Sequence, residues 1–206
     1  MTDLTYEEAR PEDLGAVIAI SAITHREHQD RLPEAFPAGL DNELNGLFRA
    51  HFAPGKNGGA YPVTRLILCR EGRKIVGHVF LRVQRFDRQT EHHDVVGTVM
   101  DISILPAYRQ RGIGTRLIEE ARAAMRQMGA TRVDAHIWRG NHASATTFAR
   151  QGFEPLYGLY VQRLSDPRSG RVNRDEGRTL RPNRTLILSL ALNLLLLLGL
   201  IVFLSR

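Results

Sequence analysis

Hydrophobic residues in the first 164 positions fall into segments with strand spacing and segments with helix spacing. In Arg132–Trp138, Val133, Ala135 and Ile137 alternate with other residues, as in a strand with one buried face. Other segments, bounded by turn residues, also predict strands. These are Leu4–Arg10, Thr64–Arg70, Lys74–Gln84, Val95–Leu105 and a final pair between Phe153 and Leu164.

Helical spacing is clearest in Gly114–Met128. Five of its residues share one face of a helix: Leu117, Ile118, Ala121, Met125 and Met128. Further helices are predicted from Pro11, over Asn42–Phe52 and over His142–Gln151. The order β-α-α-β-β-β-α-β-α-β-β predicts an α/β (α+β) domain, residues 1–164, built on a mixed sheet.

One long apolar run has neither spacing. Leu186–Leu204 contains no charged residue, and only Ser189 and Asn193 are polar. At ~1.5 Å per residue, a helix of this length spans the ~30 Å hydrocarbon core of a bilayer. A buried core helix would carry a polar stripe, which this run lacks. We therefore predict a C-terminal transmembrane helix over residues 185–204.

The distribution of charge supports the same expectation. The formal net charge is +6, and residues 165–206 hold seven arginines and three acids, which leaves +2 for the domain. The excess therefore belongs to an Arg-rich juxtamembrane linker, residues 165–184, and disfavours a nucleic-acid-binding domain. Under the positive-inside rule, this flank predicts a single-pass protein with its domain in the cytoplasm. The single cysteine, Cys69, lies in an apolar run and is expected to be a buried hydrophobe.

The segment most informative about chemistry is Ile102–Thr115, ISILPAYRQRGIGT, in which a strand is followed by a glycine-containing turn and a helix. Glycines let the backbone approach a ligand, and unpaired N–H groups at a helix N-terminus bind anions. The Gly-Lys-Ser/Thr of a P-loop is absent, and Leu117 stands where the dinucleotide pattern needs its third glycine.

This stretch resembles the acyl-CoA-binding signature of the GNAT superfamily of N-acyltransferases, Gln/Arg-x-x-Gly-x-Gly/Ala. A second segment, Asn141 to Phe153, is similar to that family's motif in which an asparagine opens a helix ending in Gly-Phe. The resemblance covers nearly the whole domain. It implies a GNAT-like, mostly antiparallel sheet flanked by helices, and an acyl-CoA-dependent N-acyltransferase that uses acetyl-CoA as co-substrate, needs no metal and acts on an amine.

The resemblance also implies where the cofactor would bind. The backbone of Ile102, Ser103 and Ile104 would pair with the pantetheine arm, and Asn141 would lie near the thioester. The diphosphate would lie on the turn and the start of the following helix. The residues expected there are Arg109, Gln110, Arg111, Gly112, Ile113, Gly114 and Thr115.

The sequence leaves the residues that transfer protons open. Many relatives carry a general-acid tyrosine where this chain has Phe148. Tyr108, Tyr157 or Tyr160 could replace it, water could serve instead, or catalysis could be feeble. For the general base, His136 and Asp101 are the two candidates, and each could instead be an ordinary strand residue with a satisfied partner.

Two hypotheses follow for function. The first is an N-acetyltransferase held at the cytoplasmic membrane face, in which an amine attacks the thioester directly. The second is a catalytically weak or inactive acyl-CoA-binding module that acts through a membrane partner, and Phe148 favours it. The sequence identifies neither the amine acceptor nor the oligomeric state.

Overall fold

A five-stranded sheet lies at the centre of the computed structural model, which describes residues 3–33, 40–53, 62–87 and 93–156. Its strands run in sequence order: β1 (Leu4–Glu8), β2 (Val63–Glu71), β3 (Lys74–Asp87), β4 (His93–Ile104) and β5 (Arg132–Ala135). Neighbouring strands are antiparallel except β4 and β5, which are parallel. The predicted mixed, mostly antiparallel sheet is confirmed.

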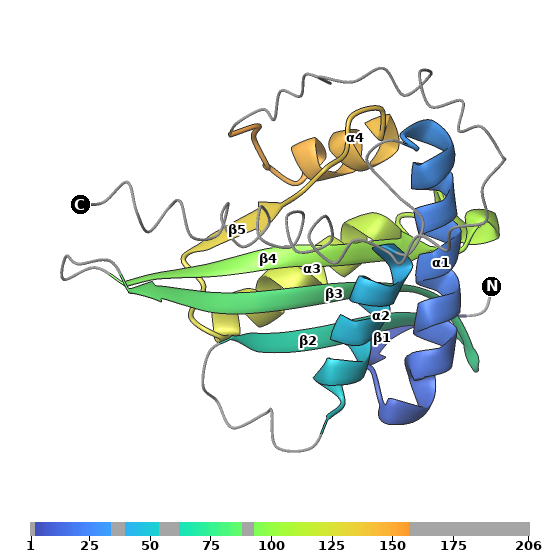
Figure 1. The fold of residues 1–206 in the computed structure, drawn as a ribbon, viewed down its shortest axis with the longest axis horizontal. Coiled ribbons are helices and arrows are strands. Elements are labelled where there is room, and N and C mark those ends of the chain that lie inside the picture. The colour runs from blue at the N-terminus through green and yellow to red at the C-terminus, as the bar shows by residue number, and fades with distance from the viewer. Residues whose placement is uncertain (1–2, 34–39, 54–61, 88–92, 157–206) are drawn as a thin grey trace, which may run out of the picture. The chain divides into compact units, whose positions relative to one another are not determined.

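Helices cover both faces of this sheet (Figure 1). One face is covered by α1 (Leu14–Arg31), which follows the 3-10 turn Pro11–Asp13, and by α2 (Leu40–His51). The other face is covered by α3 (Ile113–Gln127), against which α4 (His142–Arg150) packs. A second 3-10 turn, Pro106–Tyr108, connects β4 to the segment before α3.

Each face of the sheet has its own hydrophobic core, which explains the two sets of amphipathic helices. On the α3 face, the predicted stripe of Leu117, Ile118, Ala121 and Met125 is fully buried, as is Cys69. On the α1 and α2 face, Val17 and Ile20 pack with Phe48 and Phe80. The spacing of apolar residues therefore predicted correctly which side of α3 faces the sheet.

A bulge at Met100 interrupts the pairing of β3 and β4. Phe80 pairs with Asp101 and Leu81 with Val99, so Met100 is an extra residue in β4. Because of this insertion, Met100 and Asp101 both face α1 and α2, whereas Val99 and Ile102 face α3.

Strand boundaries differ from the sequence prediction at three places. The segment 85–94, expected to be a loop, is strand up to Asp87 and again from His93, because the hairpin ladder continues through polar residues. The strand expected to reach Trp138 ends at Ala135, and the Asn141 N–H closes a turn onto the Trp138 carbonyl instead. Residues 153–156 form no strand, and the rest of the predicted last pair lies outside the described residues.

The predicted linker, 165–184, and transmembrane helix, 185–204, also lie outside the described residues. Among the helices of the described segments, none combines the length and the apolar character needed to cross a bilayer.

A buried ion pair fastens the start of α1 to the sheet. The Asp13 side chain, 8% exposed, accepts from the Arg10 N–H at 2.9 Å and from Nη2 of Arg70 at 2.6 Å. Burial would raise the pKa of Asp13, but the Arg10 amide and the Arg70 guanidinium outweigh it and hold the pKa below its ordinary value.

We predict that Asp13→Ala lowers the free energy of unfolding by about 3 kcal/mol, because the largely buried Arg70 loses one of its two carboxylate partners (Glu7 remains) and the Arg10 N–H loses its acceptor. Since the folded pKa is depressed, this stabilisation is complete above the unfolded value of ~3.9 and is lost as the pH falls through the folded pKa. Urea unfolding at pH 7 and pH 3 measures it. The control Glu12→Ala removes an exposed carboxylate, and an equal loss in both variants would contradict the prediction.

Candidate functional site

The edge of β4 that faces β5 loses its partner halfway along the strand. The parallel pairing runs only from Val96 with Arg132 to Val99 with Ala135. Figure 1 shows the chain after β5 rising away from β4 toward α4. Across the segments that the structure describes, no strand pairs with this edge from Met100 to Ile104. Backbone groups along this stretch are therefore available to an extended ligand.

The turn that follows β4 presents a set of backbone N–H groups, which we call the amide turn (residues 110–115). Within the described part of the chain, none of these six N–H groups donates to a backbone or side-chain acceptor. Gln110 (φ 60°) and Gly112 (φ 77°) adopt the left-handed conformation, and Gly112 directly precedes α3. Such a turn at a helix N-terminus forms a concave anion site.

The two glycines of the motif have different roles in this geometry. Gly112 has open space around the position of a Cβ, so its left-handed φ is what requires glycine. At Gly114, a Cβ would lie 3.3 Å from Cδ1 of Ile104. Gly114 therefore lets the first turn of α3 lie close to the end of β4, which brings the amide turn next to the unpaired strand edge.

The flanking arginines, by contrast, are already paired with carboxylates. Arg109 donates from Nε to the Ile104 carbonyl at 3.1 Å and from Nη1 to Glu27 at 2.8 Å. Arg116 pairs with Glu119 and Glu120 along α3. Anion binding in this conformation therefore depends on backbone amides, while the Arg109 side chain fixes the end of β4 to α1. A direct contact between Arg109 and a cofactor remains a prediction from the sequence.

Arg111 and Tyr108 form a second fixed cluster beside the amide turn. Arg111 stacks over the Tyr108 ring and donates to Glu71 at 3.1 Å, and the Tyr108 hydroxyl donates to the same carboxylate at 2.8 Å. The Tyr108 hydrogen bond, followed by that of Arg111, lowers the pKa of Glu71. Tyr108 is thus engaged as a donor to Glu71. Two other candidate acids, Tyr157 and Tyr160, lie outside the described residues.

Asp101, one of the two candidate bases, lies in a buried polar network on the α1 and α2 face. Its carboxylate, 9% exposed, accepts from Nε2 of the fully buried His78 at 2.7 Å and from the Ser103 hydroxyl at 3.2 Å. Burial would raise its pKa, but the hydrogen bond and charge of His78, together with the charge of His25, hold the pKa below its ordinary value. Asp101 is therefore an ionised acceptor next to the bulge.

Sequence reasoning did not single out His78. The only signal was one histidine within the otherwise apolar start of β3, Ile75–Leu81. Its pairing with a residue 23 positions away follows from the register of β3 and β4 rather than from any local pattern.

His136, the other candidate base, lies one residue beyond the last β4–β5 pair and is exposed. Asn141 precedes α4, and its side-chain oxygen accepts from the Ser144 N–H at 3.2 Å, as expected for a helix cap. Phe148 is 3% exposed and packs edge-on against Phe153, with 4.9 Å between the ring centroids. It is therefore a core residue of the α3 face.

In the described segments, no group of three or more His, Cys, Asp or Glu side chains is arranged to hold a metal ion. The described residues offer a set of amides without acceptors, a strand edge without a paired strand and a buried carboxylate. This arrangement is suited to binding an extended ligand that carries an anionic group at the end beside the amide turn.

Comparison with known proteins agrees with this geometry. The model of the acetyltransferase (GNAT) family matches residues 21–153, more than half of the chain. No curated protein matches the sequence.

Several solved structures share the fold. A tetramutant of the BH1408 protein from Bacillus halodurans has a TM-score of 0.67 at 14% identity, covering 78% of this chain and 99% of that one. A GCN5-related N-acetyltransferase from Ralstonia eutropha has a TM-score of 0.61 at 19% identity, covering 79% and 100%. The aminoglycoside N-acetyltransferase AAC(6')-Iy, in complex with a bisubstrate analogue containing CoA, has a TM-score of 0.58 at 14% identity, covering 80% and 99%.

Proposed function

Because the chain belongs to the acetyltransferase (GNAT) family, we propose that it transfers the acetyl group of acetyl-CoA to an amine by direct attack on the thioester. The family makes it an acyl-CoA-dependent N-acyltransferase. The observation that supports this reaction most strongly is the amide turn. Its N–H groups have no acceptor among the described residues, and they lie at the end of a strand edge that no described strand pairs with.

In this proposal, the cofactor lies along the unpaired edge of β4 and then across the amide turn. The pantetheine arm lies along β4 at Ile102–Ile104, as an added strand would. The diphosphate lies on the N–H groups from Gln110 to Thr115, where the N-terminus of α3 adds a favourable dipole. The thioester then lies near Met100, since that residue begins the unpaired edge.

Three chemical tasks remain at the thioester. The attacking nitrogen must lose a proton, the oxyanion must be stabilised by backbone donors, and the thiolate must leave. We assign the first task to Asp101, acting through the acceptor or a bound water, because it is the ionised carboxylate beside the bulge. With Phe148 in the core, the leaving thiolate takes its proton from water or from a residue outside the described segments.

The amide turn gives the first test. We predict that Gly112→Ala weakens acetyl-CoA binding at least tenfold, because a Cβ disfavours the left-handed φ of 77° that orients the amides. Isothermal titration calorimetry measures the affinity. Gly129→Ala is the matched control, since Gly129 (φ 84°) caps the opposite end of α3, about 22 Å away. Equal affinities in the two variants, or no heat from the unaltered protein, would refute the proposed site.

The choice of base gives the second test. We predict that Asp101→Asn lowers kcat roughly 100-fold with acetyl-CoA affinity unchanged, whereas His136→Gln changes kcat less than threefold. The assay is CoA release against a panel of amines. The reverse pattern would make His136 the base. Acetyl-CoA binding without CoA release on any amine would favour the acyl-CoA-binding module instead.

We propose further that residues 185–204 form a single-pass transmembrane helix, with the Arg-rich segment 165–184 and the enzyme domain on the cytoplasmic side. The support is the apolar run Leu186–Leu204 and the arginines that precede it.

Truncation tests this anchor. We predict that removing residues 185–206 moves the protein from the membrane fraction to the soluble fraction without changing its acetyl-CoA affinity. Fractionation of cell extracts and calorimetry measure the two properties. The anchor is disproved if the truncated chain is unfolded, or if the full chain is already soluble without detergent.

A further inference from the structure

A cavity of about 180 Å³ lies between α2 and the sheet, on the face opposite α3. Its floor comes from three adjacent strands and its wall from α2 with the residue before β2. The floor is Thr64, Phe80, Arg82 and Met100, and the wall is Leu47, Ala50, His51 and Pro62. Drug-sized ligands fill about 300–1,000 Å³, so this pocket suits a smaller molecule.

The pocket adjoins the place where the reaction would occur. Met100 is the bulge residue of β4, and Phe80 pairs across the sheet with Asp101. Arg82 lies two residues further along β3, about 7 Å from Phe80. A molecule in this pocket can therefore extend one end toward the unpaired edge of β4 and the other toward Arg82.

Arg82 is the unusual feature of this pocket. Its Nε is buried, and within the described residues it has neither a hydrogen-bond partner nor a carboxylate in ion-pair distance. Arg82 as a whole is partly buried. This burial of a charged guanidinium is costly, and it lowers the pKa of Arg82. The other polar lining residues do not relieve this cost, since Nδ1 of His51 and the Thr64 hydroxyl bond to each other at 2.8 Å.

In the described part of the chain, no acid acts as a charge partner of Arg82. None of the residues that line the pocket is acidic. Asp101, on the paired strand, is held by His78 and Ser103. Arg82 is thus a partly buried cation that has no counter-charge among the described residues and lies next to the proposed acyl-transfer site. This is the arrangement expected when the substrate supplies the anion.

We propose that this pocket binds the acetyl acceptor and that Arg82 pairs with a carboxylate of that acceptor, so that the substrate is a small amino acid. This inference rests on the proposed acetyl transfer and adds the acceptor class to it. The amino group points toward Asp101 and the bulge, and the carboxylate toward Arg82. A bidentate Arg–carboxylate pair fixes both the position and the orientation of a small molecule.

The same features select against polycationic acceptors such as aminoglycosides. An ammonium group placed beside Arg82 would meet a like charge in a partly desolvated pocket, with no acidic lining residue to offset it. The acceptor named for one structural neighbour is therefore not the one that this pocket favours.

The test compares free L-amino acids with their α-carboxamides, which have the same shape but no carboxylate. CoA release gives kcat/KM for each pair, and calorimetry on the CoA-saturated protein gives affinity without turnover. We expect the best amino acid to exceed its amide at least tenfold in both measurements. Arg82→Gln should reduce that ratio to near one by weakening the amino acid 10- to 100-fold, mainly through KM, and Arg82→Lys should restore part of it.

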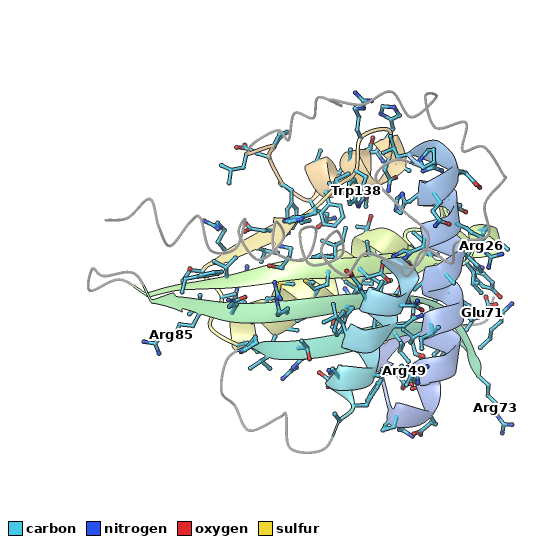
Figure 2. The ribbon with its side chains drawn as sticks, viewed as in Figure 1. Arg26, Arg49, Glu71, Arg73, Arg85 and Trp138 are labelled. Atoms are coloured by element: carbon cyan, nitrogen blue, oxygen red, sulfur yellow. The ribbon has the colours of Figure 1, made fainter. Side chains whose placement is uncertain are left out.

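Arg85→Gln is the matched control, because it removes the same charge from an exposed position of the same strand (Figure 2). Unchanged CoA affinity in each variant confirms folding.

Equal use of acids and amides, a preference for aminoglycosides, or a ratio unaffected by Arg82→Gln would overturn the inference while leaving acetyl transfer intact. Failure of acetyl-CoA to bind would overturn acetyl transfer itself. Without turnover, the affinities of each amino acid and its amide for the CoA complex still decide whether Arg82 recognises a carboxylate.

Discussion

The early end of the parallel ladder between β4 and β5 is the constraint on which this site depends. Backbone N–H and C=O groups need partners, and after Val99 no described strand pairs with the second edge of β4. The bulge at Met100 turns two successive side chains to the same face. The first effect leaves room for an extended ligand along the strand edge. The second places Met100 and Asp101 beside the opposite core. These two neighbouring irregularities lie between the proposed cofactor site and the proposed acceptor pocket.

Among the described residues, the candidate anion site at the end of β4 is built from oriented peptide dipoles rather than from free cations. The arginines around it are engaged in holding the scaffold: Arg109 connects Glu27 of α1 to the Ile104 carbonyl, and Arg111 stacks on Tyr108 and pairs with Glu71. Dipoles fixed in advance need little rearrangement when charge arrives. The arginines of this region thus mainly stabilise the scaffold. Their positive charge can also attract an anion at longer range.

Local features of this fold could be predicted from the sequence, and nonlocal ones could not. The strand–turn–helix of residues 102–115 and the buried stripe of α3 depend on neighbouring residues, so spacing and glycine positions were sufficient. The partnership of His78 with Asp101 depends on the register of two strands, and the short length of β5 depends on where the chain turns after Ala135. The position of Arg82 can be recognised only after three strands and α2 have been assembled, because what distinguishes it is a buried Nε without a hydrogen-bond partner in the described segments.

The bulge divides the proposed site into two parts that respond differently to mutation. Along the strand edge and the amide turn, the proposed cofactor contacts use main-chain atoms, which mutation alters only by changing the path of the backbone. In the pocket under α2, the proposed acceptor contacts use side chains such as Thr64 and Arg82. Under these proposals, point mutations in the pocket would exchange one amine for another without changing the donor, and sequences with this fold would diverge in their acceptors before they diverge in their cofactor.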